Sequence, residues 1–272
     1  MLAHALSIGV NRLDTAYNYL RFASHRTLAA TARDLLSRFA VSTKVGFFPT
    51  GLEAEHSLDP ARLRQAVRES VDTLGVVPDV VFLHSPERSL AGLEVPAAAQ
   101  RFAAAANVLA ELAAAGWCNR WGIATWDPRP LTHLVAAQDP EVPAPDVLMV
   151  RAGLLVPTDV LAAAEHLADR FVVRIENRWG MSAFAGRGAD PGWEELNPQA
   201  FLAPTVRCSP VQAAFAVAYA IPKVHRLAVS TNQPAHLEQL VTASWLPLIQ
   251  AEIAGYRRHL AEVTVRARTA AS

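Results

Sequence analysis

The stretch NRLDTAYNY, Asn11–Tyr19, decides how this chain is expected to fold. We interpret it as the end of a buried strand at Asp14, with Tyr19 five residues later, so a carboxylate and a phenol are expected in one pocket. Two further predicted strands end in the same manner, the first at Lys44 and the second at His84. Polar side chains at the C-terminal ends of parallel strands meet at one face of a (β/α) barrel. The sequence therefore predicts an active site at that face.

Strand and helix patterns alternate along the whole chain, which predicts a parallel α/β sheet. The predicted barrel strands cover residues 10–14, 40–44, 79–83, 120–125, 146–150, 171–175 and 226–230. The predicted helices cover 2–8, about 25–38, 60–74 and 97–115, begin at 128, 158, 210 and 234, and end with one over about 246–266. No linker is long or polar enough to divide the chain, so 1–272 is expected to form a single domain. The expected fold class is an α/β (β/α)8-type TIM barrel that is incomplete, because seven strands are predicted where such a barrel has eight.

The three strand-end motifs, DTAYNY from Asp14, TK at Thr43–Lys44 and LH at Leu83–His84, closely resemble the aldo-keto reductase family. The family signature reads D-T-A-x-x-Y, then T-K, then L-H. In that pattern a first strand precedes the first helix, whereas this chain begins with the helix. Either the strand is missing or the natural start lies upstream. A missing strand leaves two exposed sheet edges, so dimerisation through the gap, giving a homo-oligomer, is one remedy.

The resemblance implies a catalytic role for each of four residues. Tyr19 would act as general acid toward a carbonyl oxygen, and Lys44 would favour the phenolate form of Tyr19. Asp14 would hold Lys44 charged and oriented, and His84 would hydrogen-bond the substrate oxygen. Each residue also has a structural interpretation when taken alone, as a strand-end cap, a packing residue or a turn anchor. The chain has only two lysines against many arginines, so a lysine kept at a strand end favours chemistry.

The nucleotide half of the family pattern is poorly matched. The Ser and Asn that would bond a nicotinamide carboxamide are replaced by Ala124 and Thr125, and a family Gln aligns with Met149. The Arg for a 2′-phosphate is Gln233, and the Asn for adenine is Leu240. Each unpaired polar group costs on the order of 1–3 kcal/mol, so several losses together would abolish useful affinity. No cofactor is expected to bind, and NADPH is expected only if the protein is a reductase after all.

An apolar substrate pocket is also predicted near the strand ends. Its candidate residues are Phe47, Phe48, Trp126, Trp179 and Met149. Ordinary packing is an equally good interpretation for each aromatic.

Three functions remain open. The first is a redox-neutral enzyme that uses the tetrad for dehydration, isomerisation or cyclisation of a carbonyl compound, and it is narrowly preferred. The second is an NADPH-dependent aldehyde or ketone reductase with an atypical cofactor site. The third is a non-catalytic binding subunit on the same scaffold.

The composition of the chain limits the kinds of partner that are expected. The formal net charge is zero and there is no basic block, which argues against nucleic acid. The two cysteines, Cys118 and Cys208, lack metal-type spacing, so no metal site is expected. Neither a signal peptide nor a membrane span is apparent, which favours a cytoplasmic protein acting on a small-molecule carbonyl substrate.

Overall fold

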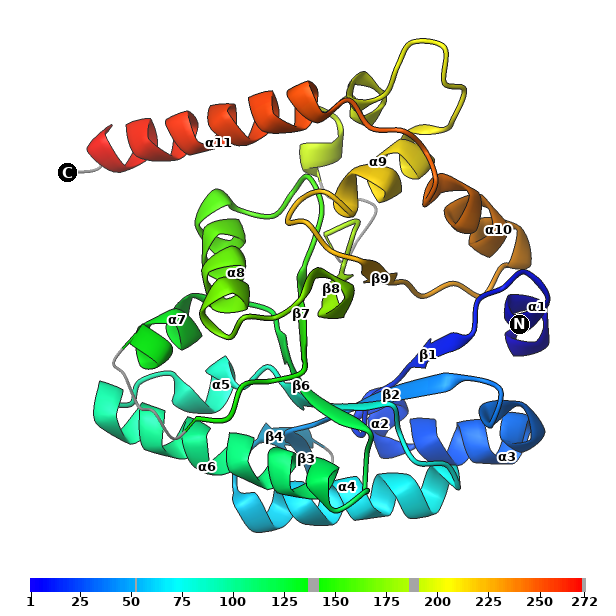
Figure 1. Cartoon of the computed structure of the whole chain (residues 1–272), viewed down its shortest axis with the longest axis vertical. Helices are drawn as coiled ribbons and strands as arrows, with labels where there is room; N and C mark the ends of the chain where they lie inside the picture. Colours follow the sequence, from blue (N-terminus) through cyan, green and yellow to red (C-terminus); the bar gives the residue numbers. More distant parts are fainter. Residues whose placement is uncertain (52, 137–141, 186–190, 271–272) are drawn as a thin grey trace. The chain divides into compact units, whose positions relative to one another are not determined.

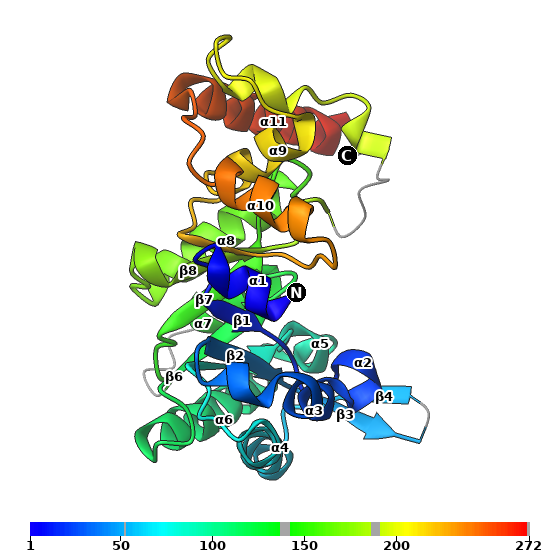
Figure 2. The same cartoon turned by 90° about the vertical axis from the view of Figure 1, so that its right-hand side faces the viewer.

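The structure is a computed structural model that describes residues 1–51, 53–136, 142–185 and 191–270. The chain forms two compact units, each described by itself below. Unit 1 comprises Met1–Met149 and Leu167–Val173, and unit 2 comprises Val150–His166 and Arg174–Ser272. Figures 1 and 2 show their helices and strands.

Seven strands form one sheet in the described residues, in the order β1-β2-β5-β6-β7-β8-β9. The pairs β1–β2, β2–β5, β5–β6 and β8–β9 are parallel. Two further strands, β3 and β4, pair as an antiparallel hairpin. The strands are β1 (Arg12–Asp14), β2 (Ala40–Val45), β3 (Phe47–Thr50), β4 (Glu53–His56), β5 (Val80–His84), β6 (Arg120–Thr125), β7 (Val147–Arg151), β8 (Arg178–Met181) and β9 (Arg226–Ala228). The fold class is therefore that of an incomplete (β/α)8-type barrel, as the alternation predicts.

Helices separate the strands of the sheet. They are α1 (Leu2–Ser7), α2 (Tyr19–Phe22), α3 (Ser24–Leu36), α4 (Pro60–Leu74), α5 (Glu87–Leu90), α6 (Val95–Ala114), α7 (Arg129–Ala136), α8 (Thr158–Arg170), α9 (Pro210–Ala218), α10 (Pro234–Ala243) and α11 (Gln250–Ala270), with 3₁₀ turns η1 (Ile175–Asn177), η2 (Pro191–Trp193) and η3 (Pro198–Phe201). In unit 1, α3, α4 and α6 pack side by side along the strands (Figures 1 and 2).

Local sequence explains where the unit 1 elements begin and end. Asp59 caps α4 by accepting a hydrogen bond from the Arg62 backbone N–H at 2.9 Å, and Pro60 occupies the first helical position. Gly75 ends that helix in the left-handed conformation, with φ +69°. The strand that follows, β5, is an apolar run whose residues Val80–Leu83 are completely buried, as expected for a parallel strand covered on both faces.

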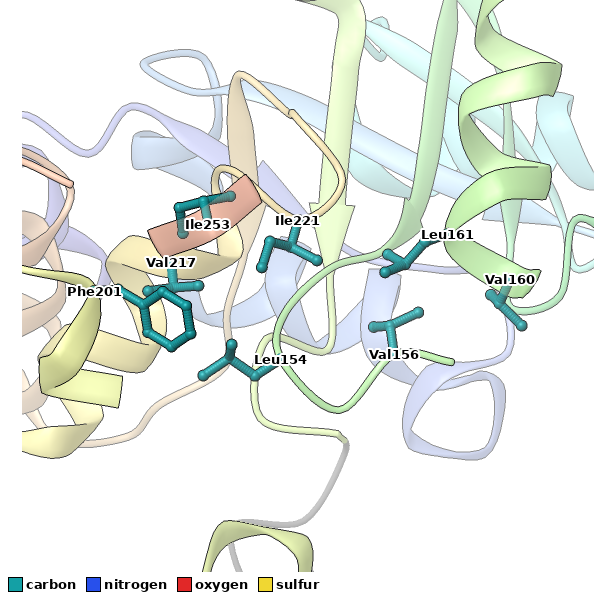
Figure 3. Close-up of a cluster of buried hydrophobic side chains, with 8 residues drawn as sticks. All are labelled: Leu154, Val156, Val160, Leu161, Phe201, Val217, Ile221 and Ile253. Carbon is teal, nitrogen blue, oxygen red and sulfur yellow. The ribbon is translucent and has the colours of Figure 1, made fainter. Parts of the chain in front are cut away.

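Unit 2 has its own apolar cores. Figure 3 shows one of them, in which Phe201, Val217, Ile221 and Ile253 gather with four aliphatic side chains from the region around the start of α8. The helix α9 begins with a capping box, because the Ser209 hydroxyl accepts from the Gln212 N–H while the Gln212 side chain accepts from the Ser209 N–H.

Several elements differ between the prediction and the structure. The predicted strand over 171–175 is wrong: α8 ends in a turn in which Val172 is left-handed, with φ +52°, and the strand begins at Arg178 instead. The hairpin β3–β4 was not expected at all. The last helix begins at Gln250 rather than near 246. Within the described residues, no helix has the length and apolar character needed to cross a membrane.

Candidate active site

Asp14 and Lys44 meet at the ends of the neighbouring strands β1 and β2. Asp14 is the register partner of Ser42 in the parallel pair β1–β2. The next residue, Thr15, donates its N–H to Ser42 O at 2.9 Å. Lys44 forms an ion pair with Asp14 Oδ2, and its ammonium also donates to Thr15 O at 3.0 Å. The Ser42 hydroxyl donates to Asp14 Oδ1 at 2.7 Å. Only 2% of Lys44 is exposed. The Asp14 carboxylate balances the charge of this buried ammonium and orients it.

Tyr19 lies directly beside this ion pair. The Lys44 ammonium sits 5.2 Å from the centroid of the Tyr19 ring, within cation–π range. The Tyr19 side chain remains 41% exposed, in contrast to the buried lysine. The site therefore has an exposed phenol in contact with a buried cation.

His84, at the end of β5, completes the group. Its ring meets the Tyr19 ring edge-on, with centroids 6.0 Å apart and planes at 76°. Burial, followed by the charge of Lys44, lowers the pKa of His84 to about 3, so the ring is neutral at physiological pH. Its Nδ1 atom is buried and has no hydrogen-bond partner among the described residues. The structure thus brings together all four predicted catalytic residues, Asp14, Tyr19, Lys44 and His84.

The unexpected hairpin supports His84 from the other side. His56 on β4 directs Nε2 at the backbone oxygen of His84, at 2.7 Å, and its Nδ1 contacts the Ser89 hydroxyl at 2.6 Å. Burial lowers the pKa of His56, so the neutral ring donates from Nε2 and accepts at Nδ1. The Phe47 ring meets both imidazoles edge-on, with its centroid 4.8 Å from that of His56 and 4.9 Å from that of His84. Gly46 has φ +139°, and a Cβ there would lie 3.2 Å from His56 Nε2 and from His84 O.

A carboxylate that sequence reasoning missed, Glu87, fills the end of β6. It is 8% exposed and accepts hydrogen bonds from the Thr125 hydroxyl at 2.9 Å, from Trp126 N–H at 2.9 Å and from Asp127 N–H at 3.2 Å. Burial raises the pKa of Glu87, while these donors act in the opposite direction. The only sequence signal was its position three residues after His84, which also fits an ordinary exposed glutamate.

The predicted substrate-pocket residues separate into different environments. Phe47 contacts the His84 ring, and Trp126 is exposed. The prediction that Phe48 and Met149 line the substrate pocket is corrected, because both side chains are buried. The Arg62 guanidinium carbon lies 4.2 Å from the centroid of the Phe48 ring, and Met149 is 0% exposed. Neither presents surface to a substrate. Trp179 belongs to unit 2, where the Arg226 guanidinium lies 5.4 Å from its ring.

The residues at the family's nucleotide positions lie in several different environments. Ala124 has no polar side-chain atom, and Thr125 is 0% exposed with its hydroxyl donated to Glu87. In unit 2, Leu240 belongs to an apolar core, and Gln233 is an exposed, uncharged residue before α10. No cluster of His, Cys, Asp or Glu suited to a metal ion occurs in the described part of the chain.

Comparisons with known proteins identify the family. The sequence profile of the Aldo/keto reductase family matches residues 1–169. This chain belongs to the aldo/keto reductase family. An aldo-keto reductase from Bacillus halodurans, in its holo form, is 19% identical with a TM-score of 0.69, over 95% of this chain and 85% of that one. A glycerol dehydrogenase from Gluconobacter oxydans is 17% identical with a TM-score of 0.72, over 95% of this chain and 83% of that one. No curated protein sequence matches this family member significantly.

Among aldo-keto reductases, this chain combines an assembled Asp-Tyr-Lys-His group with altered nucleotide positions. The matched segment, residues 1–169, contains all four members of the group as well as Ala124 and Thr125. At these identities the solved structures establish the fold alone. The activity must therefore be argued from the site.

Proposed function

We propose that this aldo-keto reductase family member performs acid–base chemistry on a carbonyl or hydroxyl group of a small molecule, with Tyr19 moving the proton and without a nicotinamide. One observation carries the proposal. At the ends of β1, β2 and β5 and at the start of α2 the acid–base residues are assembled. On the strand β6, which adjoins β5, the Thr125 hydroxyl is already bonded to the protein's own Glu87.

The proposed proton transfer rests on the environment of Tyr19. The Lys44 ammonium lies over the Tyr19 ring, and Asp14 holds that ammonium in place. A phenol beside a fixed cation is the group that we propose moves the proton. Because Tyr19 is exposed while Lys44 is not, a substrate oxygen can reach the phenol but not the amine.

His84 is the proposed partner for the substrate oxygen. Its low pKa keeps the ring neutral, so it polarises an oxygen through a hydrogen bond rather than as a second cation beside Lys44. The edge-on contact with Tyr19 and the His56 bond to its backbone oxygen restrict the ring's position.

The redox-neutral part of the proposal follows from the strand end at β6. A nicotinamide carboxamide needs hydrogen-bond partners, and neither Ala124 nor the buried, already bonded Thr125 offers one. The residues present therefore do not fit the cofactor. Without a hydride donor, Tyr19 and His84 support loss of water, isomerisation or cyclisation of a carbonyl compound.

NADPH-dependent carbonyl reduction is the second candidate, and family membership favours it. The profile match covers the segment that carries the whole tetrad, and the similar structures include a glycerol dehydrogenase. A non-catalytic role is the weakest of the three, because a buried lysine ion pair is a costly feature for a site with no chemistry to perform.

Titration of the full-length protein with NADPH, followed by calorimetry, separates the first two candidates. We expect no saturable heat at millimolar NADPH. Micromolar affinity would overturn the proposal and support the reductase.

The chemistry itself can be followed by proton NMR in D₂O with a panel of β-hydroxyketones. We expect dehydration, or exchange of the protons next to the carbonyl, with the wild-type protein and not with Tyr19→Phe. Equal reaction rates for both proteins would exclude Tyr19 as the proton-transfer group.

A further inference from the structure

Unit 1 contains a cavity of about 570 Å³ that none of Asp14, Tyr19, Lys44 and His84 lines. Its walls come from α2, the start of α3, the β3–β4 hairpin and the second half of α4. Figure 2 shows α2, α3 and the hairpin next to one another. The volume lies within the range of small-molecule sites, roughly 300–1,000 Å³. The acid–base mechanism makes no use of this space.

Two arginines on the wall of this cavity have free guanidinium groups. Arg21 and Arg26 have neither an ion pair nor a side-chain hydrogen bond within the described part of the chain, unlike several other unit 1 arginines, which are paired with carboxylates. Of the acids that line the cavity, Glu69 uses both oxygens, accepting from Tyr17 Oη at 2.5 Å and from Gln65 Nε2 at 2.7 Å. The other is Glu53, exposed on β4. A guanidinium fork with no protein partner suits an oxyanion.

The remainder of the wall suits an apolar body with a polar contact. Tyr17 and Phe22 form an edge-on pair with ring centroids 5.7 Å apart, and Pro49 and Ala54 add apolar surface from the hairpin. Asn18 also lines the cavity, and its side-chain oxygen is buried with no hydrogen-bond partner among the described residues. A buried polar atom of this kind is normally satisfied by a ligand or by water.

The backbone connects this cavity to Tyr19. Leu20, Arg21 and Phe22, which follow Tyr19 directly, all have positive φ angles, of 52°, 52° and 65°. L-residues avoid this left-handed region, and they keep it only where the surrounding structure fixes them, which is common at ligand clamps and switches. Arg21 and Phe22 line the cavity, so a ligand there touches the same turn that carries the phenol.

We propose that this cavity is a second small-molecule site, for a carboxylate or phosphate group attached to an apolar body, and that its occupant fixes the turn that carries Tyr19. The two free guanidinium groups bind the oxyanion, and Tyr17 and Phe22 pack against the apolar body. The binding half of this proposal does not depend on the acid–base function.

Fluorine NMR of the full-length protein labelled with 3-fluorotyrosine tests both halves. The chain has four tyrosines, two of them, Tyr17 and Tyr19, in unit 1 and two, Tyr219 and Tyr256, in unit 2. Variants Tyr17→Phe and Tyr19→Phe assign the signals. The probes are 3-phenylpropionate and phenyl phosphate, and the controls are benzyl alcohol, which lacks the anion, and inorganic phosphate, which lacks the apolar body.

We expect saturable shifts of the Tyr17 and Tyr19 signals with at least one probe, and none of the Tyr219 and Tyr256 signals. Which probe binds more tightly distinguishes a carboxylate ligand from a phosphate ligand. Arg21→Ala and Arg26→Ala should each weaken binding by about tenfold. Arg101→Ala removes an exposed arginine of α6 that does not line the cavity, and it should leave the affinity unchanged.

Several outcomes would overturn the proposal. The site is disproved if neither probe shifts Tyr17 saturably at millimolar concentration, if benzyl alcohol shifts it equally, or if the arginine variants bind as wild type does. Saturation at Tyr17 with no change at Tyr19 would remove the coupling between the site and the turn. Loss of acid–base activity in a separate assay would change none of these results.

Discussion

The two strands β5 and β6 are hydrogen-bonded neighbours, and His84 on one is the register partner of Ala124 on the other. On the β5 side the Asp14–Lys44 ion pair, Tyr19 and His84 form one group. On the β6 side, Ala124 has only a methyl group where the family has a polar side chain. The hydroxyl of the next residue, Thr125, donates its hydrogen bond to Glu87. Under the proposed function, proton transfer and nucleotide binding are separable properties of this scaffold.

Tyr19→Phe is the most direct way to break the β5 side. Removing one hydroxyl deletes the proton that must move, and general acid–base catalysis contributes roughly 10²–10⁴-fold. We expect the turnover number to fall by that factor while the urea unfolding midpoint stays close to wild type. Wild-type turnover by Tyr19→Phe would show that the phenol is not the acid.

Asp14→Ala tests whether the ion pair is a unit. It leaves the Lys44 ammonium buried without its counter-charge, which should lower the free energy of unfolding by about 3 kcal/mol. The double variant Asp14→Ala/Lys44→Met removes both charges and should recover most of that loss in urea unfolding, without recovering activity. If the double variant is less stable than Asp14→Ala, the ion pair is not the source of the effect.

Glu87→Ala tests the β6 side. It deprives the Thr125 hydroxyl and two backbone N–H groups of their acceptor, so the free energy of unfolding should fall by about 2 kcal/mol. Glu87→Gln keeps one acceptor oxygen and should cost less. Glu94→Ala, at an exposed glutamate before α6 with no capping hydrogen bond, is the matched control. Equal effects of Glu87→Ala and Glu94→Ala would mean that Glu87 does not organise the strand end.

The pH dependence of stability tests the burial of the neutral His84 ring. Its folded pKa of about 3 lies below the ordinary 6.5, so its contribution is fully present above pH 6.5 and is lost as the pH falls toward 3. In that window the unfolded chain takes up a proton that the folded chain does not. His25, with a pKa lowered to about 4 by burial, acts in the same direction, so the comparison must be made between proteins.

Urea unfolding of wild type and His84→Gln at several pH values isolates this contribution. Between about pH 6 and 4.5 the wild-type unfolding free energy should fall more steeply, by about 1.4 kcal/mol per pH unit. His236→Gln, at an exposed histidine of unit 2, serves as the control. Equal slopes for wild type and His84→Gln would show that His84 is protonated in the folded protein.

The sequence was most informative where strands end in polar residues. Asp14, Lys44 and His84 each lie at the end of a predicted strand. The residues before His84 form a buried apolar run, whereas β1, which ends at Asp14, is exposed to partly buried. The capped helix at Asp59–Pro60 and the helix at Ser209–Pro210 were equally predictable, because their start signals are local.

Features that depend on contacts far apart in the sequence could not be predicted. Glu87 fits a surface residue until the β6 turn, 38 residues later, supplies three donors. The apolar run from Phe171 has the composition of a strand, yet Val172 turns the chain at the end of α8 and the strand forms only at Arg178. Tyr17 fitted a packing residue, and it does pack against Phe22 and Phe48, but its bond to Glu69 was not foreseeable.

The burial of Lys44 has a practical consequence for labelling the protein. The chain has two lysines, and the other, Lys223, is exposed in unit 2. An amine-reactive reagent should therefore modify Lys223 and the N-terminal amine rapidly, giving a nearly site-specific label. Acylation of Lys44 requires unit 1 to open locally. The rate of this acylation, followed by peptide mass spectrometry, therefore measures how often the structure opens around the acid–base group.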